Sequence, residues 1–458
     1  MSTKKLSLID STTIIAGSMI GSGIFIVSAG IARDVNGSPG LLIMAWVMTA
    51  VITILGALSY GELSAMMPKA GGQYIYLKEA FGPLYGFLYG WALFAVIQTG
   101  TIAAVAVAFA KFTGVFIPQI GPDKVVLNLF GFAINTQQLL AVGVIIFLTT
   151  FNFRELKSSA LLQNIFTIAK ILALLLLVLL GFWFGCKGFG DWSHFSPAFP
   201  DTITLASIGV FGAAMTGALF SADAWNNITY TAGEVDRPQR NLPLSLFLGT
   251  SSVLLIYILA NIAYIYVLPI EQIKTAENDR VATLMMQTIL GDKGKLFMAA
   301  MIMVSTFGCL NGIIFTAGRV YYAMAKDGYF FKSAGTLNKN QVPANALTMQ
   351  CIWACLLCFS GTYGNLLDYI MFVVMLFYAL TIIGLFKLRI SRPEMERPYK
   401  AFGYPVLPAI YVLLAVWVSS VMFIHKMDFC IYGLIIVLIG VPIYFFLKKV
   451  NSQTISNQ

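Results

Sequence analysis

Two ionisable side chains lie within long apolar stretches of this sequence, Lys170 in one and Asp223 in another. A charge inside such a segment is rare and costly, so by default it marks a functional site. The carboxylate of Asp223 can bind an ammonium group, exchange a proton, or accept hydrogen bonds from the free N–H groups of a helix end. The ammonium of Lys170 needs acceptors nearby. Lys170 lies about ten residues from the charged loop at Lys157, too deep for simple snorkelling to the membrane surface.

Backbone groups are a second source of chemistry. The motif Gly21-Ser22-Gly23 interrupts an apolar run over residues 8–31, although each glycine inside a helix costs about 1 kcal/mol relative to alanine. An unwound segment here leaves N–H and C=O groups bare, which is tolerable only where they line a cavity or meet a ligand. A similar interruption runs from 216 to 227. Gly17 and the first glycine of the motif could instead serve close helix packing, but the second stretch favours two broken helices.

The composition identifies an integral membrane protein. Of 458 residues, 58% are hydrophobic and 11% are charged, whereas a soluble domain carries about 25% charged residues. Basic residues punctuate the loops, so the net charge of +9 does not indicate nucleic-acid binding. No disulfide framework, metal site, cofactor site or hydrolytic constellation is expected, and the chain is not predicted to be an enzyme. The two localised interruptions also differ from the repeated polar stripes of a channel.

About 20 apolar residues cross a bilayer, and twelve such segments are predicted within a single membrane domain, 1–458. Their positions are 8–33, 39–67, 83–117, 134–152, 160–185, 204–232, 243–268, 296–326, 346–361, 365–389, 405–424 and 430–448. The excess of Lys and Arg in alternate loops predicts that both termini are cytoplasmic.

An odd number of spans in each half predicts an inverted repeat. Residues 8–185 would form the first repeat of five spans and 204–389 the second, with 405–448 as two accessory helices. Each repeat then begins with an interrupted helix. Such a pair in corresponding positions predicts a binding site between the two halves.

An ordered set of motifs gives the chain a family resemblance over residues 8 to 390. The motifs are Gly21-Ser22-Gly23-Ile24-Phe25, Tyr60-Gly61-Glu62-Leu63, Pro68-Lys69-Ala70-Gly71-Gly72-Gln73-Tyr74, Glu79-Ala80-Phe81-Gly82, Gly86-Phe87-Leu88-Tyr89-Gly90-Trp91, Phe220 to Trp225, Gly233-Glu234, Pro238-Gln239-Arg240-Asn241-Leu242-Pro243, and Arg319 with Ala323-Met324-Ala325-Lys326-Asp327-Gly328. With these motifs the chain resembles the amino acid–polyamine–organocation superfamily, and within it the L-type amino acid transporter family.

The resemblance implies a LeuT-like fold and transport of L-amino acids by alternating access. Sodium-independent exchange of neutral amino acids is the first expectation, and proton-coupled symport is the alternative. A sensor without transport is a more remote one. Eukaryotic members often join a heavy subunit through a cysteine between spans 3 and 4, but residues 118–133 contain none. A bacterial-type carrier in the inner or plasma membrane is therefore expected, without a disulfide-linked subunit, as a monomer or weak oligomer in contact with lipid.

The resemblance also assigns site residues that agree with the backbone argument. The N–H groups of Ser22, Gly23 and Ile24, at the positive end of a half-helix, would bind the substrate carboxylate. Carbonyls would accept from its ammonium. These carbonyls belong to Met19, Ile20, Phe220, Ser221 and Asp223.

Supporting roles fall on nearby side chains. Lys170 matches a lysine of L-type relatives near the place where sodium-coupled relatives hold an ion, and it is expected to brace carbonyls around Ala16 to Ile20. For Asp223, related bacterial sequences favour the helix cap over titration. Gating is assigned to Phe220, Trp225, Phe377 and Tyr378, and ion pairs at an inner gate to Glu62, Glu234 and Arg240.

Overall fold

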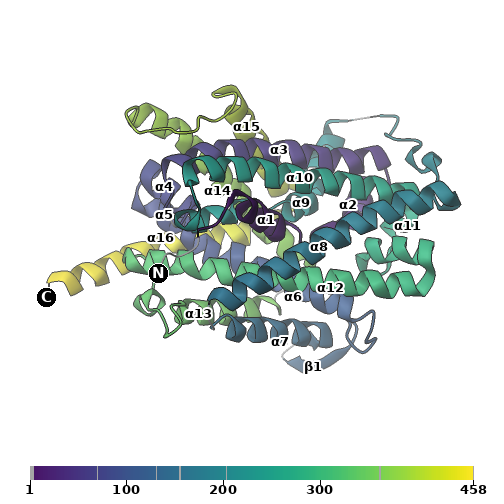
Figure 1. The fold of residues 1–458 in the computed structure, drawn as a ribbon, viewed down its shortest axis with the longest axis horizontal. Coiled ribbons are helices and arrows are strands. Elements are labelled where there is room, and N and C mark those ends of the chain that lie inside the picture. The colour runs from purple at the N-terminus through teal and green to yellow at the C-terminus, as the bar shows by residue number, and fades with distance from the viewer. Residues whose placement is uncertain are drawn as a thin grey trace.

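The computed structural model describes residues 5–456 except 70, 130, 131, 154, 155, 203 and 360–362. These residues form a bundle of helices that run roughly along its long axis (Figure 1). The α-helices are α1 (Leu8–Met19), α2 (Gly23–Asp34), α3 (Pro39–Met66), α4 (Gln73–Phe81), α5 (Pro83–Ala92), α6 (Gln98–Thr113), α7 (Thr136–Phe151), α8 (Leu156–Phe184), α9 (Leu205–Ser221), α10 (Pro238–Val267), α11 (Ile270–Lys274), α12 (Val281–Lys326), α13 (Ala344–Leu357), α14 (Tyr363–Ser391), α15 (Val406–His425) and α16 (Met427–Ser456).

Short irregular elements join these helices. A π-helical turn, η1 (Leu93–Ile97), connects α5 to α6, and a 3-10 helix, η4 (Trp225–Glu234), follows α9. The remaining short elements are η2 (Gly185–Phe189), η3 (Trp192–Phe195), η5 (Glu277–Asp279) and η6 (Lys332–Gly335). The strands β1 (Val125–Leu129) and β2 (Phe132–Asn135) pair antiparallel and were not predicted from the sequence.

The all-helical membrane fold is confirmed. Among the described residues, nine helices are long and apolar enough to cross a membrane, and the bent pair α1 and α2 makes a tenth. Two of the predicted spans correspond to shorter apolar helices, α7 with 16 residues and α13 with 14. The count of twelve spans and the inverted repeat remain predictions.

Both helix interruptions occur where the glycine and serine clusters predicted them. A capping box of Ser7 and Asp10 begins α1, which ends at Met19, and α2 restarts at Gly23 with a bend of 44°. The second break separates α9 from η4 at residues 222–224. There Ala224 has a φ of 64°, a left-handed conformation that is uncommon for a residue with a side chain.

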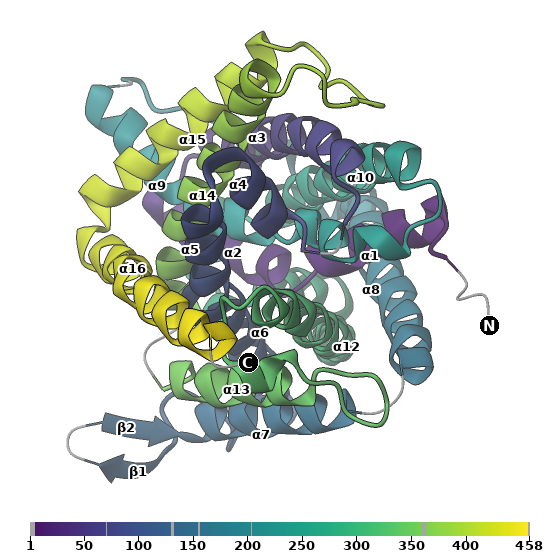
Figure 2. The same cartoon turned by 90° about the vertical axis from the view of Figure 1, so that its left-hand side faces the viewer.

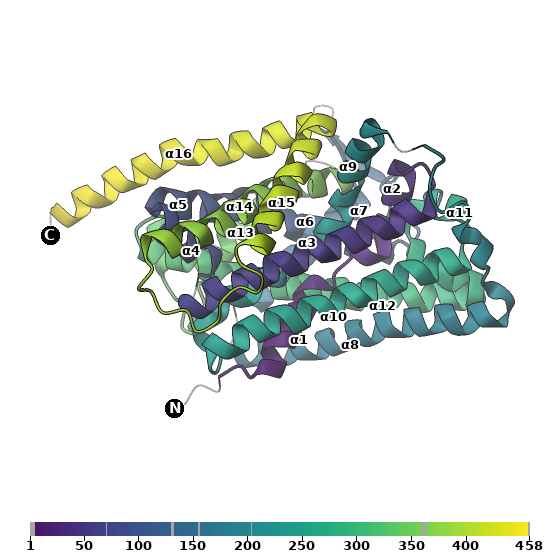
Figure 3. The same cartoon turned by 90° about the horizontal axis from the view of Figure 1, so that it is seen from above.

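The bundle has two distinct ends. Both termini lie at one end, which we call the terminal face, and α11 lies at the other (Figures 1 and 3). We call this second end the hairpin face, because the strands β1 and β2 connect α6 to α7 there. Figure 2, seen along the bundle from the terminal face, shows α2 and α6 inside a ring of other helices, with α7, α13, α15 and α16 at the edge.

Close packing holds the broken helix α1–α2 at the centre. The first half, α1, packs against α8, α10 and α12, and the second half, α2, packs against α9. At the terminal face the chain before α1 is bound to the loop after η4. Leu6 donates from its N–H to the Glu234 carbonyl at 2.8 Å and accepts from the Asp236 N–H at 2.8 Å. The result is a short parallel bridge between Leu6 and Val235.

Candidate functional site

A small cavity of about 20 Å³ joins the two breaks, and we call it the break cavity. Its walls come from the ends of α1 and α2, from the end of α9, and from α6 and α12 where they pass the breaks. The lining residues are Ser18, Met19, Gly21, Ser22, Gly23, Thr101, Val105, Phe220, Ser221, Asp223, Ala224, Cys309 and Ile313. Two segments about 200 positions apart in the sequence therefore face one space.

Six of the eight predicted binding residues line this cavity: Met19, Ser22, Gly23, Phe220, Ser221 and Asp223. The other two, Ile20 and Ile24, are fully buried and lie beside it. Because α2 begins at Gly23, the N–H groups of its first turn have no preceding helical turn to bond with. These donors, with the positive end of the α2 dipole, suit an anionic group such as a carboxylate.

Two tyrosines of α10 hold the edges of the first break. Tyr257 donates from its hydroxyl to the Met19 carbonyl at 2.9 Å, and Tyr264 donates to the Ile24 carbonyl at 3.3 Å. Each carbonyl oxygen has two lone pairs, so the Met19 carbonyl can still accept from a ligand. The backbone on each side of this break is therefore held by a hydrogen bond from a side chain of α10.

Asp223 does not act as the predicted helix cap. The residue before η4 is Ala224, and no side-chain hydrogen bond caps this helix. The Asp223 carboxylate accepts from the Tyr378 hydroxyl of α14 at 2.6 Å and from the backbone N–H of Ala224. Asp223 thus faces the cavities, where its charge can meet a ligand.

The four predicted gate residues do not share one position. Phe220 lines the break cavity, and Tyr378 lines a second small cavity beside it, which is described below. Trp225 packs between Tyr60 and Tyr378, with ring centroids 4.9 Å and 5.3 Å away, while Phe377 packs against Tyr89 at 5.4 Å. Neither Trp225 nor Phe377 is in the wall of either cavity, so these two rings support the wall from behind.

Lys170 of α8 is fully buried, and its ammonium donates a hydrogen bond to the Gly17 carbonyl in the last turn of α1. This contact falls within the stretch of carbonyls that the sequence predicted for it. Cys309 of α12 approaches the same turn, with its sulfur 3.6 Å from the Ser18 carbonyl. The negative end of the α1 dipole is thus matched by a cation.

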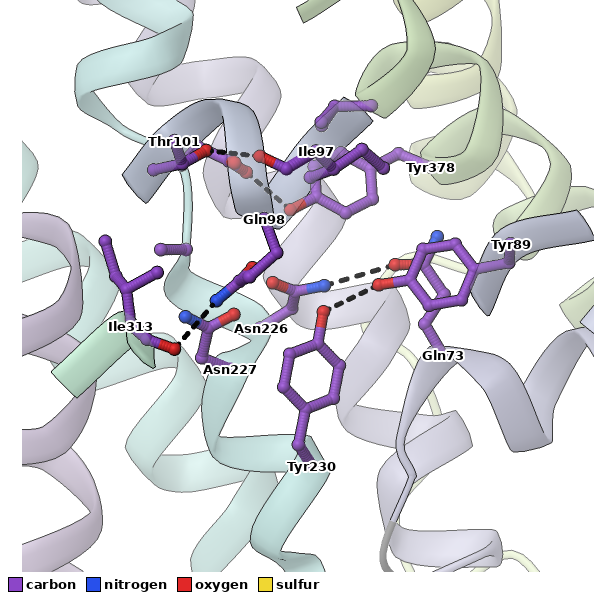
Figure 4. Close-up of a pocket in the computed structure, with 13 residues that line it drawn as sticks. Gln73, Tyr89, Ile97, Gln98, Thr101, Asn226, Asn227, Tyr230, Ile313 and Tyr378 are labelled. Carbon is purple, nitrogen blue, oxygen red and sulfur yellow. Dashed lines mark hydrogen bonds between the residues drawn. The ribbon is translucent and has the colours of Figure 1, made fainter. Parts of the chain in front are cut away.

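Figure 4 shows the neighbouring cavity, also about 20 Å³, which we call the amide cavity. Its lining residues are Gln73, Tyr89, Ile97, Gln98, Thr101, Asp223, Ala224, Asn226, Asn227, Tyr230, Ile313, Val374 and Tyr378. Sequence reasoning missed its side-chain amides. The available signal was Gln98 inside an apolar span and the pair Asn226-Asn227 directly after the second break.

The hairpin face holds a much larger cavity, of about 750 Å³. Its deep wall includes Val27 of α2, Val107 of α6 and Gly217 of α9. Val27 and Gly217 are about one helical turn from Gly23 and Ser221 of the break cavity, and Val107 is two residues from Val105. The breaks are therefore approached from the hairpin face by a wide cavity.

Ion pairs close the terminal face. The Glu62 carboxylate is fully buried and accepts from Arg389 at 2.5 Å, from the Ala401 N–H at 2.7 Å, and lies 3.5 Å from Arg397. Glu234 lies 3.4 Å from Arg319. The third predicted gate residue, Arg240, is exposed. The described side chains at this face are thus tied across several helices.

Known proteins resemble the chain over almost its whole length. A family profile described as "Amino acid permease" matches residues 6–450. The large neutral amino acids transporter small subunit 2 of Oryctolagus cuniculus is 32% identical over 96% of this chain and 80% of that protein. The b(0,+)-type amino acid transporter 1 of Mus musculus is 31% identical over 96% of this chain and 87% of that protein.

A third relative, the Asc-type amino acid transporter 1 of Mus musculus, is 30% identical over 96% of this chain and 81% of that protein. The matched span includes both helix breaks and Lys170. These similarities confirm the family that the motifs indicated. The chain belongs to the amino acid permease family, and it is a membrane carrier of amino acids rather than an enzyme.

Proposed function

We propose that this carrier exchanges neutral L-amino acids across the membrane without sodium. The observation that carries the proposal is the hydrogen bond from the buried Lys170 ammonium to the Gly17 carbonyl. A cation fixed at the end of α1 supplies the positive charge that a sodium ion would otherwise bring to this turn. The relatives named as transporters of neutral amino acids support the substrate class.

The two breaks together bind the two charged groups of the amino acid, its carboxylate and its ammonium. The N–H groups at Ser22, Gly23 and Ile24 bind the carboxylate, and carbonyls at Met19, Ile20, Phe220 and Ser221 accept from the ammonium. Asp223 contributes its carbonyl, and its side chain adds a negative charge to the same space. These backbone groups bind the carboxylate and the ammonium, which all α-amino acids have. Selection between different amino acids must therefore depend on residues that contact the substrate side chain.

Alternating access operates between the two faces. In this structure the hairpin face is open, with a cavity of about 750 Å³, and the terminal face is closed by the Glu62 and Glu234 ion pairs. We assign the terminal face, with both termini, to the cytoplasm of a cell with a bacterial-type inner or plasma membrane. The moving parts are the repeats 8–185 and 204–389, with 405–448 as an accessory pair.

No disulfide-linked subunit is required. One relative is named a small subunit, but the segment 118–133 of this chain contains no cysteine. Purified protein is expected to run as one species with and without reductant, as a monomer or weak oligomer. A reductant-sensitive larger species in its native membrane would contradict this part of the proposal.

Counterflow in proteoliposomes tests the function. Liposomes loaded with L-alanine should take up labelled L-alanine rapidly with or without sodium, and empty liposomes should not. Accumulation driven by a proton gradient into empty liposomes would identify a symporter instead. Strict sodium dependence would contradict both mechanisms, and binding without any uptake would identify a sensor.

A further inference from the structure

The break cavity and the amide cavity are neighbours with a common wall. Both are lined by Thr101, Asp223, Ala224 and Ile313. The amide cavity lies on the side toward the terminal face, since it is built from the start of α4 and from η4. A molecule held by its head at the breaks therefore has this second space directly beside it.

Most of the amide groups in the second space are already oriented. Asn226 donates from its side chain to the Gln73 side-chain carbonyl at 3.1 Å, and Gln73 donates to the Thr381 hydroxyl at 3.0 Å. Gln98 donates to the Ile313 carbonyl at 3.3 Å. This last bond turns the amide nitrogen of Gln98 toward α12 and fixes the side chain at the wall (Figure 4).

One amide has no such partner. The Asn227 side chain is 4% exposed, lines the cavity and makes no hydrogen bond to any described residue. The side-chain carbonyl of Gln98 likewise accepts no hydrogen bond from the described part of the chain. Neither group is among the fully enclosed unpaired atoms of the described residues, so both reach the cavity, where a ligand can pair with them. In Figure 4, Asn227 lies beside Gln98 and Ile313, inside the cavity.

We propose that the amide cavity receives the side chain of the transported amino acid and selects short, uncharged side chains that end in a hydroxyl or a carboxamide. The inference rests on the proposed function, because it assumes that the amino acid head binds at the breaks. Asn227 supplies both a donor and an acceptor, and Gln98 supplies an acceptor. The volume of about 20 Å³ has room for about one water-sized group.

The chemistry of the amide cavity favours these polar side chains over aliphatic, aromatic and cationic ones. An aliphatic side chain of the same shape would leave both amides unpaired, and sites built for hydrogen bonds discriminate strongly against such analogues. An aromatic side chain exceeds the space. A cationic side chain would be drawn to Asp223, but that carboxylate already accepts from Tyr378 at 2.6 Å.

Matched pairs of substrates test the proposal on the wild-type protein in proteoliposomes. Exchange is measured for L-threonine and L-valine, and for L-asparagine and L-leucine, because the two side chains of each pair are short and of nearly equal shape. We expect kcat/KM to be about tenfold or more higher for the polar member of each pair, the effect of one hydrogen bond or more. Equal values would overturn the proposal and leave the amide cavity a water-filled part of the path only. A preference for L-lysine over both pairs would overturn it too, in favour of selection by Asp223.

Two variants test whether Asn227 is responsible for the preference for polar side chains. Asn227→Leu should bring the threonine-to-valine ratio of kcat/KM close to one, and this ratio, rather than the absolute rate, is the readout. As a control, Thr250→Val removes a fully buried hydroxyl of α10 that has no partner in the described structure and lines neither cavity. The threonine-to-valine ratio of this variant should stay at the wild-type value. If Asn227→Leu does not yield folded carrier, Asn227→Ala makes the same comparison. A ratio that stays at the wild-type value in the Asn227 variant would contradict the assignment.

Failure of the inference is distinguishable from failure of the proposed function. Alanine has no side-chain polar group, so its exchange reports only the head-group site. If alanine exchange is present and the pairs are equal, the inference alone is wrong. If no amino acid exchanges in the wild-type protein, the proposed exchanger is wrong as well.

Discussion

Lys170 and Gly17 are 153 positions apart, yet the ammonium of one donates directly to the carbonyl of the other. The bond joins α8 to the last turn of α1, where the helix ends beside the break. It fixes the half-helix that must move if the terminal face is to open. The buried cation therefore holds the end of α1 beside the proposed substrate site, although Lys170 does not line the break cavity itself.

Replacing Lys170 tests this brace. Lys170→Ala should lower turnover at least about tenfold with a smaller loss of affinity, because the α1 carbonyls lose their cation. Lys170→Arg should restore only part of the rate, since a planar guanidinium does not replace a compact ammonium in a tight site. Substrate affinity and turnover are measured separately on purified variants. Lys124→Ala, at an exposed position before β1, is the control. Wild-type turnover in Lys170→Ala would show that the residue is a spectator.

Gly23→Val should abolish transport while folded protein remains. A side chain at Gly23 would overlap the Ser221 side chain and approach its backbone, filling the space between the two breaks. Gly143→Val makes the same change on α7, where an added side chain meets nothing within 4 Å. We expect the Gly143 variant to transport normally. Near wild-type counterflow by Gly23→Val would mean that the head-group site is misplaced.

Tyr378→Phe removes the hydroxyl that donates to Asp223 at 2.6 Å. A hydrogen bond to a charged group contributes about 1.5–3 kcal/mol, so substrate affinity should fall about tenfold as the Asp223 carboxylate loses its fixed position. Binding is measured by scintillation proximity or calorimetry. Tyr411→Phe, which changes an equally buried tyrosine of α15 outside both cavities, should leave affinity unchanged. Equal affinities in the two variants would count against a role for Asp223 in the site.

Glu62→Gln should destabilise the closed terminal face. This carboxylate is fully buried against Arg389 and Arg397, and removing one partner of a buried ion pair costs about 3 kcal/mol or more. Glu79→Gln breaks the half-exposed pair with Arg392 and should cost less than about 1 kcal/mol. Thermal unfolding in detergent compares them. An equal or smaller drop for Glu62→Gln would contradict the importance of this pair.

The sequence was sufficient for features that depend on local residue types. Glycines and serines inside an apolar run predicted both breaks, because the propensity of a segment to leave the helical conformation depends on its own residues. The functional importance of Lys170 followed from the mismatch between a charge and its apolar surroundings. Its contact with the end of α1 was implied by the family resemblance. The family and the all-helical fold came from motifs that recur in order along the chain.

Pairings between distant segments could not be read from the sequence. The Asp223 bond to Tyr378 joins positions 155 apart and depends on how α14 packs beside the second break. The expected helix cap was wrong because Ala224, and not Asp223, holds the N-cap position of η4. A local partner was the simpler interpretation of an isolated acidic residue. The amide cavity was missed likewise. Gln73, Gln98 and Asn227 come from three separate segments that only the packed bundle brings together.

The bridge between Leu6 and Val235 has a mechanical consequence. It ties the chain entering the first broken helix to the loop leaving the second one. Any tilt of α1 at the terminal face must pull on η4, or else break two backbone hydrogen bonds. The two broken helices are thus connected twice, by this backbone bridge at the terminal face and by the break cavity that both of them line. Motion started at one hinge is transmitted to the other through the backbone itself.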